Sequence, residues 1–359
     1  MKIERVHFYC RDAVRTKDWF VRNIGFKAIA NYSDGNTHTE LVVLNSAHFL
    51  ISSPLNNLSP VAQYLTTHPT GVADIVFRVK NLEAIIDRNH NLGRKILQDI
   101  QLKRSPQGVF KEAKIEGWND LHHTLIEAEE DNLCLPVAIE SKHFDRIGQL
   151  NITGIDHVVL NVAQGNLHSA VELYQKLFNF QVQQSFDIQT SKSGLTSQAL
   201  IDDSRRVQFN INQPSGANSQ IQEFIDYNGG SGIQHLALRS QNLIADVAQI
   251  QSGLQFLAVP QAYYQNLEAL SYLSLAEREA VTRQQILVDS DYTSPESLLM
   301  QIFTQPIFEQ PTFFLEFIER RQSAQGFGQG NFKALFEAVE RQSEHRLSIQ
   351  NQEKKTVHS

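Results

Sequence analysis

The segments GVADIVFRVKNL (71–82) and GIQHLALRSQNL (232–243) repeat one pattern in the two halves of the chain. Each begins with Gly, ends with Asn-Leu and has a strand-like alternation between these ends. A second pair stands earlier in each half, in the same order. VHFYC (6–10) and GIDHVVL (154–160) are short apolar runs, and each precedes a helical pattern. Two matches in one order predict a duplicated module of strand, helix and further strands.

The helical patterns of the two halves differ in sequence but share their spacing. In the first half the apolar positions are Val14, Trp19, Phe20 and Ile24, and the pattern stops at Gly25. In the second half they are Leu167, Ala170, Val171, Tyr174, Leu177 and Phe178. Spacings of three and four predict one buried face per helix. Helices are too few to cross over between parallel strands throughout, so the pattern favours an α+β fold with mostly antiparallel strands.

Length and composition limit the class of protein. The 359 residues, 41% hydrophobic and 20% charged, predict about two domains and exclude collagen-like or disordered chains. We place the domains at 1–145 and 150–340, joined by the polar connection KHFDRIGQLNI (142–152). Residues 341–359 lack apolar periodicity, and we expect a disordered polar tail.

Charge and cysteine usage exclude several partners. The net charge is −7 and no basic stripe is present, so nucleic acid is not an expected partner. No apolar run is long enough for a membrane span, and no signal peptide is evident. The two cysteines, Cys10 and Cys134, are far apart and form neither a disulfide scaffold nor a thiolate zinc site. These features predict a cytoplasmic protein.

Three ionisable residues of the second half lie in otherwise apolar strand patterns. They are His157 in GIDHVVL, His235 in GIQHLAL and Glu316 in PTFFLEFIERR (311–321). Strand alternation puts Phe314, Glu316 and Ile318 on one face. Because burial without a partner is costly, we expect the three groups to share a partner or to be satisfied separately. Two imidazoles and one carboxylate form the facial triad of non-haem Fe(II), which leaves coordination positions open. Their spacing in the sequence does not decide between these alternatives.

The repeat supplies an internal contrast for this triad. It pairs His7 with His157, Asp74 with His235 and, roughly, Thr124 with Glu316, so the first half lacks the triad and is expected to be structural. The adjacent His122 and His123 point to opposite faces of a strand and do not predict a shared metal. GFGQGNF (326–332) only superficially resembles a phosphate loop, because neither a preceding βαβ context nor GK[ST] is present.

From about residue 150 to 340, the chain resembles the 4-hydroxyphenylpyruvate dioxygenase family of the vicinal oxygen chelate superfamily. Further motifs that carry the resemblance are SGLTSQAL (193–200), VQFNINQP (207–214), SQIQEFI (219–225), PQAYYQNL (260–267), LLMQIFTQP (298–306) and GFGQGNFKALFEAVE (326–340). The first half matches mainly in position. The resemblance implies two tandem vicinal-oxygen-chelate domains of paired βαβββ modules with barrel-like mixed sheets. Only the C-terminal domain would be catalytic.

The resemblance also assigns a site. His157, His235 and Glu316 would hold Fe(II). The polar groups around the substrate would be Ser197, Asn212, Gln220, Gln234 and Gln301. The pocket walls and lid would be Phe303, Phe314, Phe327, Asn331 and Phe332. This mixture suits a substrate with an aromatic ring, a phenol at one end and a 2-oxo acid at the other. Asn210 departs from the proline of some family members.

The implied activity converts 4-hydroxyphenylpyruvate and O2 to homogentisate and CO2, through oxidative decarboxylation, ring hydroxylation and side-chain migration, as in tyrosine catabolism. The resemblance suggests a homo-oligomer, a dimer or a tetramer. Three alternatives of this fold stay open: a 4-hydroxymandelate synthase, an extradiol dioxygenase and a non-catalytic ligand-binding protein. The product distinguishes them.

Overall fold

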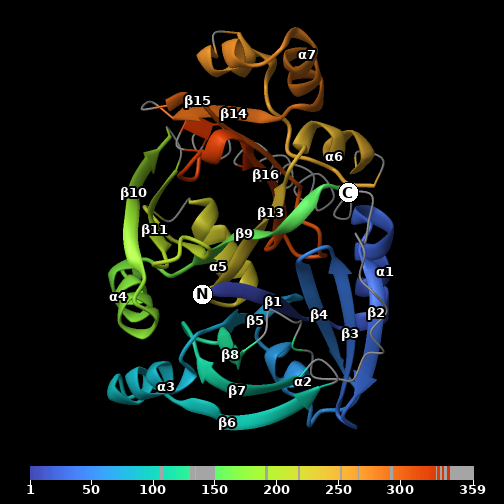
Figure 1. Cartoon of the computed structure of the whole chain (residues 1–359), viewed down its shortest axis with the longest axis vertical. Helices are drawn as coiled ribbons and strands as arrows, with labels where there is room; N and C mark the ends of the chain where they lie inside the picture. Colours follow the sequence, from blue (N-terminus) through green and yellow to red (C-terminus); the bar gives the residue numbers. More distant parts are fainter. Residues whose placement is uncertain are drawn as a thin grey trace, which may run out of the picture.

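Two eight-stranded sheets, one from each half of the chain, make up the computed structural model (Figure 1). The strand orders are β2-β3-β4-β1-β5-β8-β7-β6 and β10-β11-β12-β9-β13-β16-β15-β14, so the second sheet repeats the first. The structure describes residues 1–105, 108–129, 134, 150–190, 193–216, 219–250, 253–265, 267–291, 294–328, 330–331, 334 and 338–339. The expected duplication and the α+β class are confirmed.

The elements of the first half lie in the order β1 (Lys2–Tyr9), α1 (Ala13–Ile24), β2 (Lys27–Ser33), β3 (Thr37–Leu44), β4 (Ala47–Pro54), α2 (Pro60–Tyr64), β5 (Gly71–Arg78), α3 (Leu82–Asn91), β6 (Ile96–Ser105), β7 (Gly108–Glu116) and β8 (His122–Ala128). The second half begins with β9 (Ile152–Asn161), α4 (Leu167–Phe178), β10 (Gln181–Gln189), β11 (Gly194–Ile201), β12 (Gln208–Pro214) and α5 (Gln220–Asn228).

The second half continues with β13 (Gly232–Ser240), α6 (Leu243–Ile250), the 3-10 turns η1 (Gln261–Tyr264) and η2 (Glu268–Tyr272), α7 (Leu275–Gln284), β14 (Leu287–Asp291), β15 (Ser294–Phe303), β16 (Phe314–Arg320) and η3 (Arg321–Ser323). The insertion η1–η2–α7 between α6 and β14 has no counterpart between α3 and β6.

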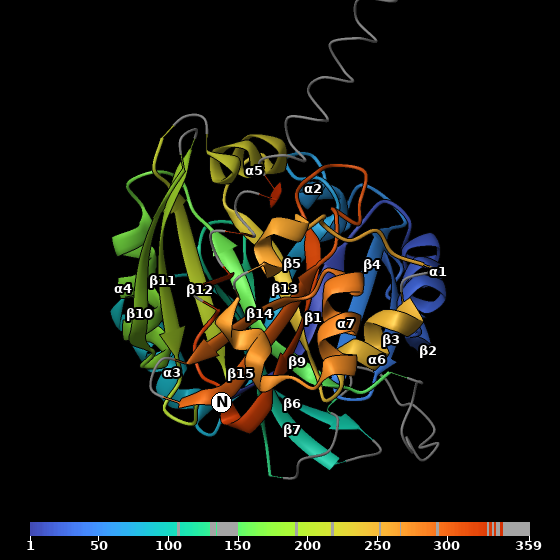
Figure 2. The same ribbon diagram turned by 90° about the horizontal axis from the view of Figure 1, so that it is seen from above.

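Each sheet contains two βαβββ modules. In every module the first strand pairs in parallel with the fourth, as in β1 with β4 and β9 with β12, and the other pairings are antiparallel. A parallel pair requires a long crossover, which the helix and two intervening strands supply. Seen from above, the second sheet curves with β9 and β13 at its middle (Figure 2).

The helices begin and end where the sequence provides caps. Asp12 accepts a hydrogen bond from the Arg15 amide at the start of α1, and Gly25 ends it in the left-handed conformation with φ of 88°. All six apolar positions predicted for α4 are buried. Of the positions predicted in α1, Phe20 and Ile24 are buried and Trp19 is half-buried, whereas Val14 is 45% exposed.

The hydrophobic core is continuous between the two halves, so the halves pack against each other. One buried cluster includes Phe8 and Phe49 of the first half together with Phe313 of the second, and the Phe8 and Phe313 rings meet edge to face at 5.3 Å. Polar contacts add to this packing. His123 Nε2 lies 3.0 Å from the Tyr174 hydroxyl, and His123 is completely buried. His122 lies on the opposite face of β8, as expected.

The strand register corrects one expected correspondence. Asp74 and His235 are both the fourth residue of a strand that begins with Gly. His7 lies opposite Asp74, whereas Val159 lies opposite His235. His7 therefore matches Val159, and Arg5 takes the place of His157. Short apolar runs align equally well two residues apart, because a shift of two keeps the same face inward. Thr124 does match Glu316.

The domain boundary and the tail stay predictions. The connection 142–152 lies mostly outside the described residues, and the tail 341–359 lies outside them entirely. Among the helices that the structure describes, none is long and apolar enough to cross a membrane.

Candidate active site

Three neighbouring strands of the second sheet bring the predicted triad together. Ala237 on β13 lies in register with His157 on β9 and with Glu316 on β16. His235 is two residues from Ala237 on the same strand, and residues two apart share a face. All three side chains therefore project from one face of the sheet, although their positions in the sequence are far apart.

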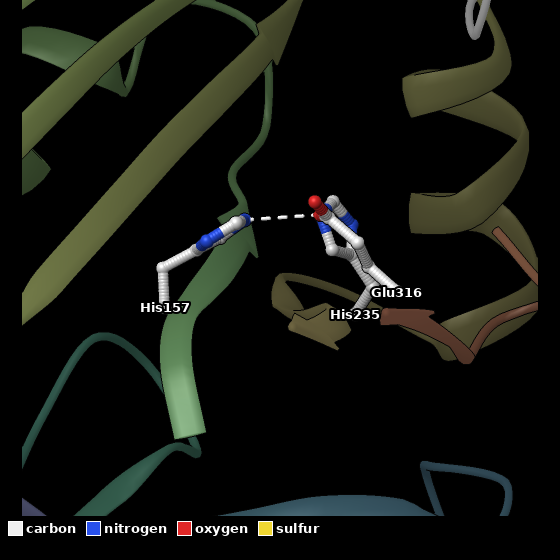
Figure 3. Close-up of side chains that lie close together, drawn as sticks. All are labelled: His157, His235 and Glu316. Atoms are coloured by element: carbon white, nitrogen blue, oxygen red, sulfur yellow. Dashed lines mark ion pairs between the residues drawn. The ribbon is translucent and has the colours of Figure 1, made fainter. Parts of the chain in front are cut away.

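The three side chains converge on one point (Figure 3). His157 Nε2 lies 3.1 Å from Glu316 Oε2, and His235 Nε2 lies 3.5 Å from the same oxygen. One candidate ligand atom from each residue lies within 4.8 Å of the others, and all three residues are buried. Among the described residues this is the single group of His, Cys, Asp and Glu side chains with such geometry. Two nitrogens and one oxygen fit a divalent transition metal.

The electrostatics of the triad favour a shared cation. Burial opposes charge on His157, but the carboxylates of Glu316 and Asp156 outweigh it and raise the pKa of His157 to about 9. Burial likewise opposes ionisation of Glu316, yet His157 lowers its pKa to about 2. Burial lowers the pKa of His235, so this ring is neutral and ready to donate its lone pair. A proton on His157 thus occupies the place that a metal ion would take.

A second layer of charge lies behind His157. Asp156 is completely buried, and its Oδ1 lies 3.0 Å from His157 Nδ1. Arg320 donates two hydrogen bonds to Asp156 at 2.7 and 2.9 Å, and Arg239 donates one at 2.7 Å. A carboxylate in this position fixes the ring orientation of a metal-binding histidine. Sequence reasoning missed Asp156 and Arg320, although a carboxylate directly before His157 was visible in GIDHVVL.

A cavity lies directly over the triad. About half of the residues predicted for the pocket line this cavity. Beside the triad it is lined by Val159, Asn210, Asn212, Gln301, Phe303, Phe327, Gly328 and Asn331. Five of these eight were expected, and Val159, Asn210 and Gly328 were not named as site residues. About 20 Å³ of the cavity is open to the centre of a water-sized sphere, which is enough for at least one water molecule.

A second cavity is lined by other residues that were predicted for the site. Gln220, Gln234 and Phe314 line it together with Thr312, which sequence reasoning missed. Ser197 lies opposite Asn212 across the β11–β12 pair and is fully buried. Phe332 lies outside the described residues, so its predicted place in the lid stays a prediction.

Several buried polar atoms in these walls have no hydrogen-bond partner within the described part of the chain. They are Ser197 Oγ, Asn210 Oδ1, Asn212 Oδ1, Gln220 Oε1 and Thr312 Oγ1. Buried polar groups are nearly always paired in native proteins. Asn210 and Asn212 line the cavity over the triad, and Gln220 and Thr312 line the second cavity. Their unpaired atoms therefore fit a polar ligand that supplies the missing partners.

Aromatic rings frame the triad. The Phe314 ring stacks on His235 with centroids 4.6 Å apart and planes at 18°. Phe327 meets His157 edge to face at 5.2 Å, and Phe303 meets His235 edge to face at 6.2 Å. These contacts restrict the two imidazoles. Phe303 and Phe327 line the cavity over the triad and Phe314 lines the second cavity, so both cavities have an aromatic wall that suits an aromatic ligand.

Gln301 joins the triad to the segment after β16. Its Nε2 donates to Glu316 Oε1 at 2.9 Å and to the Phe327 carbonyl at 3.2 Å, while Asn331 Nδ2 donates to its Oε1 at 2.9 Å. Gly328 has φ of 74°, and a Cβ there would collide with Gln301. The glycines of GFGQGNF therefore serve a close backbone approach.

Comparison with known proteins identifies similar chains. Residues 154–268 match the model of the Glyoxalase/Bleomycin resistance protein/Dioxygenase superfamily. An uncharacterised protein of Synechocystis sp. is 36% identical over 95% of this chain and 97% of its own length. 4-Hydroxyphenylpyruvate dioxygenase of Caenorhabditis briggsae is 32% identical over 96% of this chain and 93% of its own. A triple mutant of 4-hydroxymandelate synthase from Streptomyces coelicolor superposes with a TM-score of 0.85 and 26% identity, covering 95% of this chain and 98% of that chain.

Proposed function

The chain belongs to the 4-hydroxyphenylpyruvate dioxygenase family, and we propose that it converts 4-hydroxyphenylpyruvate and O2 to homogentisate and CO2. We propose Fe(II) as the metal, with His157, His235 and Glu316 as its ligands. The observation that carries the proposal is the convergence of these three buried donors beneath a cavity with aromatic and amide walls.

The donor set accounts for the role of the metal. Fe(II) held by His157, His235 and Glu316 would supply the binding and activation of the 2-oxo acid and of dioxygen. The reaction balances without a further reductant. The substrate loses its carboxyl carbon as CO2, its keto carbon becomes a carboxylate, and its ring gains one hydroxyl group, which together take up both atoms of O2.

The protein's own residues bind and orient the substrate. Phe303 and Phe314 offer faces for the aromatic ring. The unpaired Ser197, Asn212 and Gln220 atoms offer hydrogen bonds to its polar ends, and Gln234 and Gln301 stand beside them. Phe327 covers His157 and is 3% exposed, so it excludes water from the reacting atoms. We assign Asn331 and Phe332 to the same cover.

The similarity to 4-hydroxymandelate synthase supports a second candidate. That activity would use the same fold, metal and substrate but hydroxylate the benzylic carbon, so wall shape near the ring decides between the two products. We favour homogentisate because dioxygenases of several organisms are over 30% identical across nearly the whole chain.

One experiment tests the proposal. The purified protein is loaded anaerobically with Fe(II) and mixed with 4-hydroxyphenylpyruvate and air, and the product is identified by chromatography and mass. We expect homogentisate, with one O2 consumed and one CO2 released per turnover. 4-Hydroxymandelate would establish the synthase instead. No product from iron-loaded protein would contradict the substrate assignment.

The remaining family properties also stay predictions for this chain. Light scattering tests the expected dimer or tetramer, and cell fractionation tests the cytoplasmic location. A role in tyrosine catabolism requires that disruption of this chain's gene causes 4-hydroxyphenylpyruvate to accumulate.

A further inference from the structure

One wall of the cavity over the triad lies outside the sheet. His157, Asn212 and His235, like most lining residues, stand on strands, whereas Phe327 and Gly328 follow β16. Only about 20 Å³ of this cavity is open to the centre of a water-sized sphere, so its walls lie close together over the triad. Strands are held by ladder hydrogen bonds, and a loop opens at lower cost. The loop of residues 324–328, which we call the closing loop, is therefore the wall that can move at the lowest cost.

Arg320 holds this closing loop from the end of β16. Its Nη1 donates to the Gly326 carbonyl at 2.6 Å and to the Ala324 carbonyl at 3.2 Å. The Nε and Nη2 atoms of the same guanidinium donate hydrogen bonds to the Asp156 carboxylate at 2.9 and 2.7 Å. The side chain is only 8% exposed, so these charge-assisted bonds form away from solvent, where they are strongest.

The contact continues from Asp156 to the triad. Asp156 holds His157 Nδ1, and His157 Nε2 faces Glu316. On the other side of the closing loop, the Phe327 ring rests against the His157 ring. The loop and His157 therefore share one support, and a shift of the guanidinium changes the positions of both.

We propose that Arg320 is a positioning residue that couples closure of the loop 324–328 to the orientation of His157. The coupling rests on the proposed function, because it acts on a metal only if the triad binds one. A planar guanidinium is suited to this role, since it bonds a carboxylate on one edge and carbonyls on the other. Closing the loop then fixes His157, and a bound metal in turn favours the closed loop.

The chain offers a matched control at the next residue. Arg321 pairs with Glu319 and Glu277, each at 2.7 Å. Within the described part of the chain, neither glutamate forms a hydrogen bond or ion pair with the triad or the closing loop. Arg321→Gln therefore removes an arginine ion pair of the same region without touching the coupling. Arg320→Lys keeps a cation for Asp156 but has no second edge for the carbonyls, and it also guards against misfolding of Arg320→Gln.

The test compares amide hydrogen exchange of residues 324–328 with and without Co(II), together with the Kd for Co(II). In the wild type we expect Co(II) to slow the exchange about tenfold or more. In Arg320→Gln the loop exchanges faster even without metal, protection by Co(II) is lost, and the Kd rises about 10- to 100-fold. Arg320→Lys speeds loop exchange with a smaller change in Kd. Arg321→Gln behaves as the wild type.

Two results would separate the possible failures. Wild-type loop exchange and Co(II) protection in Arg320→Gln would overturn the coupling, whatever the metal site does. If the wild type binds no Co(II), the proposed metal site fails, and the metal-free comparison alone decides whether Arg320 holds the loop.

Discussion

The sheets of the two halves have the same strand order and register. The second sheet carries the triad His157, His235 and Glu316. At the equivalent positions the first sheet carries Arg5, Asp74 and Thr124. The first set contains its own cation. The second set contains two imidazoles and a carboxylate, with no fixed positive charge among them. The same scaffold therefore holds a set that includes a cation in one half and a donor set compatible with a metal ion in the other.

In the first sheet, neighbouring side chains of the same half pair with the buried carboxylate of Asp74. Thr124 donates to Asp74 through its amide and hydroxyl at 2.8 and 2.6 Å, and Lys114 Nζ lies 3.2 Å away. By register Lys114 occupies the place of Phe303. Burial opposes ionisation, but Lys114 and Thr124 hold the pKa of Asp74 well below its usual range. His7 is kept neutral because burial lowers its pKa to about 3. The comparison teaches that a few side chains, not the fold, decide where a metal can bind.

The largest expected effect separates the two halves. Glu316→Ala, His157→Ala or His235→Ala removes a ligand, so we expect loss of metal retention and of turnover with the fold intact. The equivalent change in the first half, Thr124→Ala, should leave both intact. Metal content per chain and product formation are measured on purified variants, with circular dichroism as the folding control. Full activity in any triad variant would refute the assignment.

A change in the first half should affect stability but not metal. Lys114→Met leaves Asp74 buried without its cation, and we expect the free energy of unfolding to fall by roughly 3 kcal/mol. Lys111→Met removes surface pairs with Glu83 and Glu127, which solvent screens, and should cost much less. Urea unfolding gives both values. A drop in metal content in Lys114→Met would show that the halves are not independent.

A smaller effect is expected at Gln301, which holds Glu316 and the Phe327 carbonyl. Gln301→Ala should weaken metal binding about tenfold, since it removes the partner that orients a ligand. Its counterpart by register is Glu112, which lies 4.0 Å from Arg5. Glu112→Ala should leave the Kd unchanged, as measured by titration with Co(II). Equal Kd values for the two variants would remove Gln301 from the site.

A pH dependence between about pH 6.5 and 9 is expected from the triad of the second half. The pKa of His157 rises from the ordinary value of 6.5 to about 9 in the metal-free fold. Protonated His157 therefore stabilises that fold below about pH 6.5, and the contribution is lost as the pH rises to 9. Metal competes with this proton, so affinity should increase over the same range, by at most about tenfold per pH unit. Opposite slopes for unfolding and for metal affinity are expected, and parallel slopes would contradict the competition.

Much of the fold could be predicted because the local periodicity of apolar residues indicates the strands and helices. The Gly-to-Asn-Leu pattern marks β5 and β13, and apolar spacing marks α4. The register could not be predicted, because a shift of two residues keeps the same face inward. The sequence pattern therefore pairs His7 with His157, whereas Arg5 is the true equivalent of His157. The insertion between α6 and β14 was not predicted either, because the first half has no equivalent to reveal it.

The triad could be predicted because an ionisable group inside an apolar strand stands out. Asp156 was missed because alternation puts it on the face opposite His157, where an exposed residue is the usual interpretation. It is buried because Arg239 and Arg320, distant in sequence, meet there. Lys114 was missed for a similar reason, because KEAKIE (111–116) has the charge pattern of a solvent-exposed strand. Long-range charge pairing decides both cases.

The contrast between the halves is tested most directly by locating the metal. Crystals grown with Co(II) give an anomalous difference map that shows each bound ion without reference to activity. We predict one strong peak per chain, between His157, His235 and Glu316, and none beside Asp74 and Lys114. A peak beside Asp74, or none at the triad in protein that retains cobalt, would contradict the account.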